Sequence, residues 1–348
     1  MSIAVGGNCK IFHLMYCRCM QETMTVTKDI KNAVFAGDSV YDFMQGTLEL
    51  WETDPYSSQL RPLLRFVDGD HVDSLTRIGK SDLEATLLFI ILAGKACVVD
   101  PKALLTTDSS NRALHNIVLD MFSWVQSKFS QPENPFLSQK KTYLNSISRS
   151  RAPLDAALQQ DSCYIETQSL YVAALKAVIV VAQTAIDCNQ RWGGPDIREL
   201  AHVHALTKSA TIAAFAPAWN EPATVISYKS NVEALVRHGG SGVALSYILR
   251  FVAGEDDIWT VRYCCQQIKA SQQQSGFISA GCSAPIWLGE QLSCARIMRP
   301  AFPDVADRIE KAVVGLTETS PYAYVAADEL ELSRELSSWT LQALLSLQ

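Results

Sequence analysis

Apolar positions recur along most of the chain at helical spacing rather than at the spacing of a strand. Between 114 and 125 they fall on one helical face: Leu114, Ile117, Val118, Met121, Phe122 and Val125. No run alternates between apolar and polar residues over a convincing length, and no internal repeat is visible. The pattern predicts an all-α protein.

Local signals give the expected ends of several helices. Ser81-Asp-Leu-Glu84 is a capping box, and Asp100-Pro101 should stop the helix that it opens near Val99. A second helix is expected from the polar run 107–111 to Gln131-Pro132. Apolar residues also recur at helical steps between Lys28 and Trp51.

The most apolar segment is the predicted helix 170–186. Leu170, Ala174 and Val178 share one face, and the opposite face is nearly as apolar, as in a buried helix of a bundle. Lys176 is the one charge inside it and is expected to extend to the surface rather than to serve a site. The run is shorter than the roughly 20 residues of a membrane span, so we expect no membrane association.

Composition indicates a folded protein with a substantial core. Of 348 residues, 48% are hydrophobic and 19% are charged, which suits two lobes or one large domain. Ten cysteines without a repeated spacing are expected to be reduced thiols of an intracellular protein. The net charge of −6 disfavours nucleic-acid binding, but residues 163–300 hold 11 basic and 10 acidic side chains, whereas residues 301–348 hold 3 and 8.

Two motifs resemble catalytic signatures without completing them. Gly239-Gly-Ser-Gly242 lacks the last glycine of a nucleophile elbow, because Val243 stands there, and a turn at a helix boundary explains it better. Asp256-Asp257 is similar to the aspartate-rich helix of terpene cyclases but lacks the third carboxylate, so we expect acids at the start of a helix.

The two candidate sets of metal ligands also lack the spacing of a metal site. His202 and His204 are two residues apart and would face different ways on a helix, and the group Cys9, His13, Cys17 and Cys19 has no C-x-x-C pair. Cys264-Cys265 is expected to be a buried pair of small apolar residues. The sequence therefore predicts no catalytic residue, no metal and no cofactor.

Single basic residues recur through the middle of the chain, several beside the aromatic residues Trp192, Tyr228, Tyr247 and Tyr263. They are Arg191, Arg198, Lys208, Lys229, Arg237, Arg250, Arg262, Lys269, Arg296 and Arg299. Such spacing could follow the phosphates of a single strand along a groove while the aromatic rings stack on bases. An ordinary helical surface has the same pattern, and composition alone favours that alternative.

Three segments resemble a known family. They are Leu170–Trp192, with Leu175-Lys-Ala-Val178, Thr184-Ala-Ile-Asp187 and Arg191-Trp192; Gly242–Phe251; and, more weakly, Thr317–Tyr322. In this order they resemble the nucleoproteins of non-segmented negative-strand RNA viruses, the Mononegavirales, of the paramyxovirus type. The 193–208 run has fewer cations than that family shows, and the chain ends 26 residues after Tyr322.

The resemblance implies two helical lobes with a cleft between them and terminal arms. The expected parts are an N-terminal arm at 1–30, an N-lobe at 31–255, a C-lobe at 256–335 and a C-terminal docking helix at 336–348. Such a protein would not be an enzyme. It would encapsidate single-stranded RNA without sequence preference, form homo-oligomers through its arms, contact a viral polymerase or phosphoprotein, and lie in the virion and in the host cytoplasm or nucleus.

The expected RNA-binding residues combine this resemblance with the basic pattern. Arg191, Arg198 and, more loosely, Lys208 match the family's basic region, and Arg262-Tyr263 falls near its lobe junction. The full set is Arg191, Arg198, Lys208, Lys229, Arg250, Arg262, Tyr263, Arg296 and Arg299. The alternatives are an all-α enzyme of the terpene-cyclase type and a helical scaffold that binds only proteins.

Overall fold

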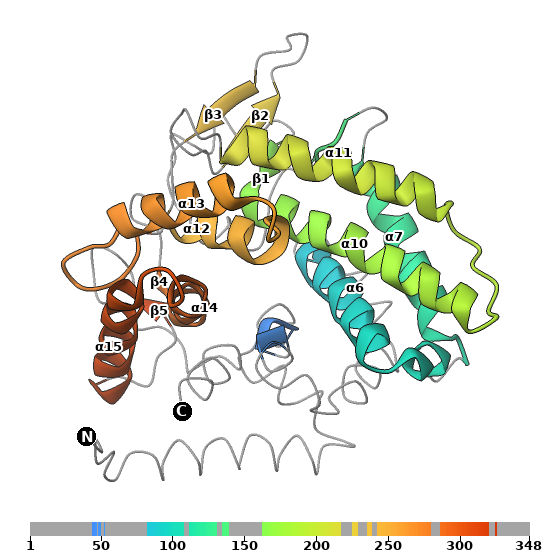
Figure 1. Cartoon of the computed structure of the whole chain (residues 1–348), viewed down its shortest axis with the longest axis horizontal. Helices are drawn as coiled ribbons and strands as arrows, with labels where there is room; N and C mark the ends of the chain where they lie inside the picture. The colour runs from blue at the N-terminus through green and yellow to red at the C-terminus, as the bar shows by residue number, and fades with distance from the viewer. Residues whose placement is uncertain are drawn as a thin grey trace.

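Helices dominate the structure, a computed structural model, as the apolar spacing predicts (Figure 1). The all-α class is therefore confirmed. The structure describes residues 44–46, 48–49, 52, 82–107, 111–130, 134–138, 162–216, 225–228, 235–238, 242–279, 286–319 and 324–325. The predicted N-terminal arm and C-terminal docking helix lie outside these residues, so exchange between protomers stays a prediction, as do the proposed domain boundaries.

Helix α10, Ile165–Asp187, lies at the centre of one group of helices. It packs against α6, Asp82–Val99; α7, Leu114–Phe129; and α11, Ile197–Phe215 (Figure 1). Leu170, Ala174 and Val178 are fully buried, as predicted. The helix begins before residue 170 and has 23 residues, so by length and composition it could cross a membrane, contrary to the expectation from sequence. Here it is mostly buried among the other helices.

The end of α10 follows from a single residue with a left-handed backbone. Asn189 has a φ of 55°, and its amide donates to the carbonyl of Ile186, while the amide of Gln190 donates to that of Ala185. These two bonds form a Schellman motif, which satisfies carbonyls at the end of the helix. The chain then turns back, and Asp196 caps α11 by accepting from the amide of Arg198 at 2.8 Å. The turn lays α11 along α10.

Close contact between α6 and α10 depends on Gly94. A Cβ at this position would lie 2.6 Å from the Cβ of Ala177 and 2.9 Å from its Cα. Helix α6 ends at Val99, as predicted, and Asp100 caps the 3-10 helix η1, Pro101–Leu105. Helix α7 begins at Leu114 rather than in the 107–111 run, because Asn111 has a φ of 59° and the chain turns there.

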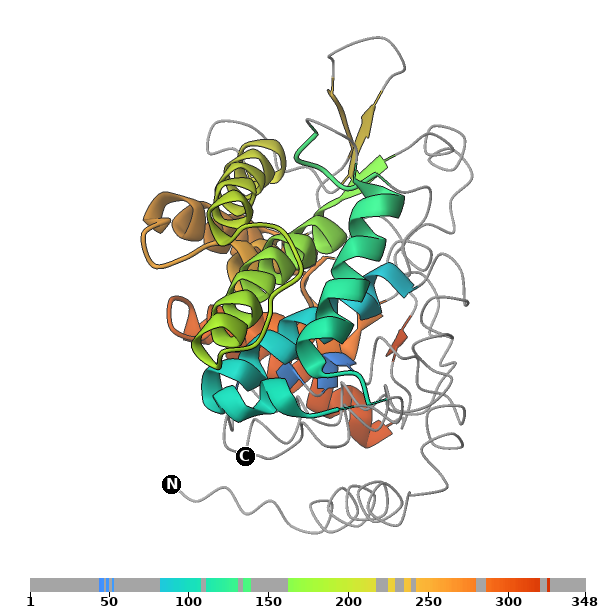
Figure 2. The same ribbon diagram turned by 90° about the vertical axis from the view of Figure 1, so that its right-hand side faces the viewer.

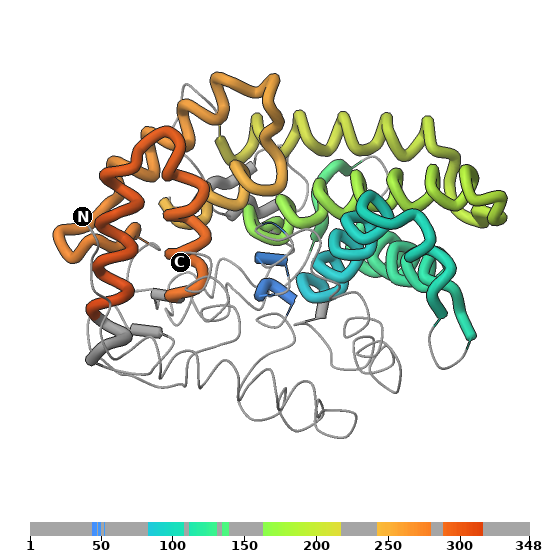
Figure 3. The backbone as a smooth tube through the Cα atoms, turned by 60° about the horizontal axis from the view of Figure 1, so that its bottom comes forward, coloured from blue at the N-terminus to red at the C-terminus, as the bar shows by residue number. Residues whose placement is uncertain are grey.

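A second group of helices lies beside the first (Figure 3). It contains α12, Gly242–Tyr247; the π-helix η2, Ile248–Val252; α13, Ile258–Ala270; α14, Leu288–Met298; and α15, Pro303–Thr319. Buried residues form two core clusters, one centred on α6, α7 and α10 and the other on α12 to α15. Cys264 and Cys265 are buried in the second, as expected.

Short strands are present that the sequence did not predict. β1, Ser162–Tyr164, pairs antiparallel with β2, Val225–Tyr228, which pairs antiparallel with β3, Leu235–His238. The β2–β3 pair projects from the helices (Figure 2). β4, Ile286–Trp287, pairs with β5, Tyr324–Val325. At two to four residues each, these strands are too short to produce a visible alternation.

Candidate anion-binding pocket

The helical pieces within 44–52 lie between the two groups of helices (Figure 3). They carry two carboxylates, Glu49 and Glu52, that meet arginines from distant parts of the chain. Nη2 of Arg250 lies 2.9 Å from Glu49 and 2.9 Å from Glu52, and Nη1 of Arg250 donates to Gln45 at 3.2 Å. Arg296 pairs with Glu49 at 3.1 Å and also contacts Glu52. We call Glu49, Glu52, Arg250 and Arg296 the ion network.

The centre of the ion network is shielded from solvent, since the side chains of Glu49, Arg250 and Glu52 are 1%, 6% and 14% exposed, whereas Arg296 is 30% exposed. Although burial raises the pKa of Glu52, the charges of Arg250, Arg296 and Lys95 hold it below its ordinary value. Burial lowers the pKa of Arg250, but Glu49 and Glu52 more than offset this and raise it. Glu52 and Arg250 are therefore both charged near neutral pH, and the network joins the helical pieces within 44–52 to η2 and α14.

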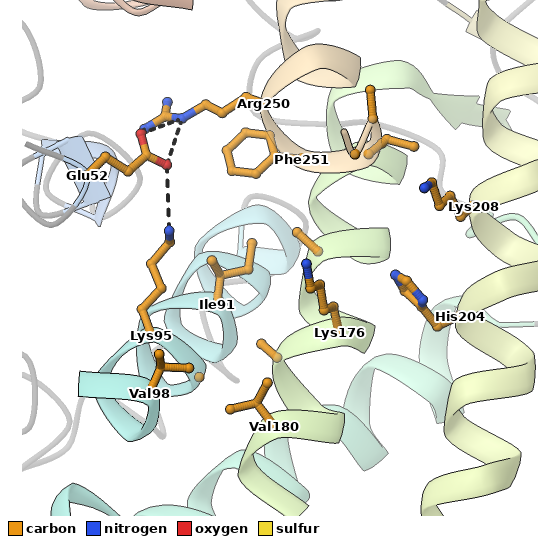
Figure 4. A pocket seen from close by; sticks show the side chains of 16 residues that line it. Glu52, Ile91, Lys95, Val98, Lys176, Val180, His204, Lys208, Arg250 and Phe251 are labelled. Carbon is orange, nitrogen blue, oxygen red and sulfur yellow. Dashed lines mark hydrogen bonds and ion pairs between the residues drawn. The ribbon is translucent and has the colours of Figure 1, made fainter. Parts of the chain in front are cut away.

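A pocket of about 290 Å³ opens beside the network (Figure 4). It is lined by α6, α10, α11 and η2 together with Glu52 and Gly254. The π-helical turn places Arg250, Phe251 and Val252 in the pocket wall, and the amide of Ala253 donates to the carbonyl of Ile248 at 2.8 Å. Insertions of this kind in helices occur frequently at functional sites.

Two sides of the pocket carry charge and the space between them is apolar (Figure 4). On one side Glu52 contacts Arg250 and lies 3.9 Å from the ammonium of Lys95. On the other side are Lys176, His204 and Lys208. In this view Ile91 and Phe251 lie between these two groups, while Val98 lies beside Lys95 and Val180 lies below Lys176.

The pocket's cations differ in whether they have a counter-ion. Lys208 pairs with Asp257 at 2.5 Å, and Asp257 also accepts from the amide of Gly254 at 2.7 Å. Lys95 has Glu52. Lys176 makes no ion pair with any residue in the described part of the chain. The described pocket therefore has an excess of positive charge, and it could hold a small anion.

Burial and neighbouring charges shift the pKa values of two of these groups, His204 and Lys95. Burial lowers the pKa of His204, and the charges of Lys176 and Lys208 lower it further. Burial also lowers the pKa of Lys95, an effect that Glu52 partly opposes. His204 is therefore neutral at pH 7 while no anion is bound.

The structure brings some of the nine predicted RNA-binding residues together and separates the others. Arg250 and Lys208 line the pocket, and Arg296 joins it through the ion network. Arg299 pairs with Asp307 at 3.0 Å and also contacts Glu310. These cations are thus held by carboxylates rather than presented along a groove.

The remaining predicted residues lie elsewhere. Arg191, Arg198 and Arg262 are exposed outside the pocket, and Tyr263 is half-buried against the second core cluster. Lys229 lies outside the described residues. Sequence reasoning missed Glu49, Glu52, Lys95 and His204 as site residues. The prediction that Lys176 extends to the surface is confirmed, because this residue is exposed, and it also lines the pocket. A lone charge on an otherwise apolar helix was the available signal for Lys176.

The terpene-cyclase alternative also finds no support in the geometry. The Asp257 carboxylate is engaged by Lys208 and by the amide of Gly254, and α13 begins directly after it, as predicted. In the described ranges no group of three or more His, Cys, Asp or Glu side chains could hold a metal ion.

Comparison with known proteins gives the fold but no family. No protein-family model matches the chain, and neither does any curated protein. A structure of a UGL variant with dGlcA-Glc-Rha-Glc is similar, with a TM-score of 0.50 and 14% identity over 88% of this chain and 85% of that chain. Unsaturated glucuronyl hydrolase from Bacillus sp. GL1 gives 0.48 with the same identity and coverage. GH63 mannosylglycerate hydrolase from Thermus thermophilus gives 0.46 at 10% identity, over 74% of this chain and 76% of that chain.

The similarity in fold to UGL overturns the identification made from sequence. UGL is not a viral nucleoprotein, so the resemblance to Mononegavirales and the nucleocapsid function derived from it are wrong. The prediction that the chain is not an enzyme, which followed from that resemblance, is contradicted with it. Helical segments of similar composition occur in unrelated all-α proteins, which is why short apolar matches misled the assignment. The chain has a helical fold similar to that of UGL.

Proposed function

We propose that this chain is an enzyme that acts on a small acidic carbohydrate bound in the pocket. The observation that carries the proposal is the uncompensated charge of Lys176 beside His204 and Lys208. An anionic group of a ligand would supply the counter-ion that the described residues do not. Charge-assisted hydrogen bonds of this kind are the strong ones in protein recognition.

Pocket size and lining agree with a sugar. A volume of about 290 Å³ is at the small end for ligand sites and suits a single ring with its acidic substituent. Phe251 presents an aromatic ring at the pocket, packed against Tyr247 with ring centroids 5.8 Å apart. An aromatic face can pack against the apolar side of a sugar ring, and the charged groups can bind its polar edges.

The similar fold allows this ligand class, since UGL was solved with the saccharide dGlcA-Glc-Rha-Glc. The carboxylates of this pocket nevertheless differ from those of most glycoside hydrolases. Most glycoside hydrolases place two carboxylates across the scissile bond, and among its described lining residues the pocket has Glu52 as its one carboxylate. Glu52 is held by Arg250, Arg296 and Lys95, so we assign it to the ion network rather than to proton transfer.

We also propose that the two core clusters correspond to two helical lobes, with the pocket in a cleft between them. Phe251 packs against both clusters, and Ala177 and Val252 bring one residue from each cluster into the pocket wall. Each cluster supplies its own hydrophobic core, as a lobe requires.

The test is binding and turnover with acidic and neutral sugars. Isothermal titration should show binding of glucuronate, galacturonate or glucose 6-phosphate and none of glucose or mannose at the same concentration. Mixtures should then be followed by NMR for conversion of the acidic sugars and of short saccharides that contain them. Equal binding of neutral and acidic sugars, or binding of neither, would overturn the proposal.

A further inference from the structure

Charge balance in and beside the pocket leaves more than one positive charge unmatched. In the first group the two carboxylates of the ion network face three cations, namely Arg250, Arg296 and Lys95. In the second, Lys208 is matched by Asp257, and Lys176 has no described counter-ion. Among the described residues each group therefore keeps one uncompensated positive charge. These two charges lie on opposite sides of the pocket, and an anion bound at the second group meets the charge of Lys176 directly.

Geometry places the second group so that one small anion can meet several donors. Lys176 extends from α10, while His204 and Lys208 lie one helical turn apart on α11, and all three line the same side of the pocket (Figure 4). Lys208 is held in place by Asp257, which leaves the other hydrogens of its ammonium group for a ligand. Three nitrogen donors from two adjacent helices suit a compact group with three terminal oxygens better than a planar carboxylate with two.

His204 can also change its charge when such a group arrives. The charged groups around it are Lys176 on α10, Lys208 on its own helix and Asp257 before α13, with Lys95, Arg250 and Glu52 across the pocket. Burial and the two lysines lower the pKa of the ring and keep it neutral in the free protein. A bound dianion would reverse that balance, so that the ring gains a proton and becomes a third cationic donor.

We infer that the acidic group that this pocket takes is a phosphate monoester, bound as a dianion between Lys176, Lys208 and His204. The inference rests on the proposed function and narrows its substrate class to phosphorylated sugars. Binding is accompanied by uptake of a proton at His204.

The first experiment is isothermal titration of the full chain at pH 7.5 with glucose 6-phosphate, glucuronate, inorganic phosphate and glucose. Glucose 6-phosphate should bind at least about tenfold more tightly than glucuronate, because the phosphate forms one further charge-assisted hydrogen bond. Inorganic phosphate should bind more weakly than the sugar phosphate, since it leaves the apolar wall uncovered. Glucose should not bind.

The two proposals fail in different ways in this titration. Tighter binding of glucuronate than of glucose 6-phosphate would overturn the phosphate inference and leave the acidic-sugar proposal standing. Absence of binding by both would overturn the proposed function itself. If inorganic phosphate binds as tightly as the sugar phosphate, the pocket takes phosphate alone, and the phosphorylated-sugar class is wrong.

Variants of Lys176 test whether its charge contributes to phosphate binding. Lys176→Gln should weaken binding of glucose 6-phosphate by about tenfold or more, and Lys176→Arg should restore most of the affinity because the charge returns. Lys102→Gln is the matched control, an exposed lysine outside the pocket whose loss should leave affinity unchanged. Unchanged affinity in Lys176→Gln would contradict the inference.

Proton uptake gives a readout that a structural role would not affect. The titration is repeated at pH 7.5 in buffers with different ionisation enthalpies, and the slope of the observed enthalpy gives the protons bound with the ligand. The wild-type protein should take up protons with glucose 6-phosphate, and His204→Gln should take up none. A slope of zero in the wild-type protein would show that His204 does not gain a proton.

Discussion

Arg250 and Glu52 join segments 198 residues apart, with Nε of the arginine donating to Oε2 of the glutamate at 3.1 Å. The NH2 group of the same arginine lies 2.9 Å from Glu49. Because the arginine side chain is nearly inaccessible to solvent, this bidentate arrangement connects the helical pieces within 44–52 to the wall of the pocket. Both the stability of the fold and the position of Phe251 should depend on it.

Removing Arg250 should strongly destabilise the protein. Arg250→Met leaves two buried carboxylates without their principal partner, and breaking a buried pair from one side costs about 3–5 kcal/mol. Urea unfolding followed by circular dichroism measures the change. The double variant with Glu49→Gln should recover part of the lost stability, because the more deeply buried carboxylate is then neutral and Glu52 still has Arg296 and Lys95 as partners. A loss of under about 1 kcal/mol in Arg250→Met would mean that the network is open to solvent.

Acid should weaken the fold through Glu52. Its pKa is below the ordinary 4.5 in the folded protein, so folding favours the ionised form. The resulting stability is fully present above the pKa of the unfolded chain and is lost as pH falls through the lower pKa of the folded state. Unfolding free energy should therefore fall below about pH 4.5, and less steeply in Glu52→Gln than in the wild-type protein. Parallel curves for the two proteins would exclude Glu52 as a contributor.

A methyl group at Gly94 should separate α6 from α10. The new Cβ would lie 2.6 Å from the Cβ of Ala177, with backbone directly behind it, so Gly94→Ala should cost about 1–3 kcal/mol and disturb the pocket wall. Gly315→Ala in α15 is the matched control, because no atom of the described residues lies within 4 Å of its added Cβ. That change should stabilise the protein by about 0.5–1 kcal/mol. Thermal unfolding of the two variants should therefore shift in opposite directions.

The turn from α10 to α11 depends on the left-handed backbone of Asn189. Asn189→Gly should be neutral or slightly stabilising, whereas Asn189→Val should cost about 1–2 kcal/mol because a branched side chain is strained at a φ of 55°. Melting temperatures measured side by side would show the difference. Equal melting temperatures would mean that the turn relaxes freely and does not fix α11 against α10.

Elements whose signals are local could be predicted from the sequence. Asp100-Pro101 marks the end of α6, and the buried positions Leu170, Ala174 and Val178 follow from their spacing. The burial of Cys264 and Cys265 follows from their apolar character in the same way. Each of these depends on neighbours within one helix.

The site could not be predicted in this way because its members are distant in the chain. Nothing in the sequence pairs Arg250 with Glu49 and Glu52, so a buried structural arginine was taken for an RNA contact. Lys176 and His204 become a pair only when the turn at Asn189 folds α11 back along α10. Net charge along the chain also gave no indication of which cations would be matched by carboxylates.

The most direct test of the acidic-sugar pocket is a crystal structure of the protein with the acidic sugar that binds most tightly in the titrations. The account predicts ligand density in the pocket, with the acidic group within hydrogen-bond distance of the Lys176 ammonium and a sugar ring packed against Phe251. A saturated crystal that shows no ligand in this pocket, or shows the acidic group bound elsewhere, would contradict it.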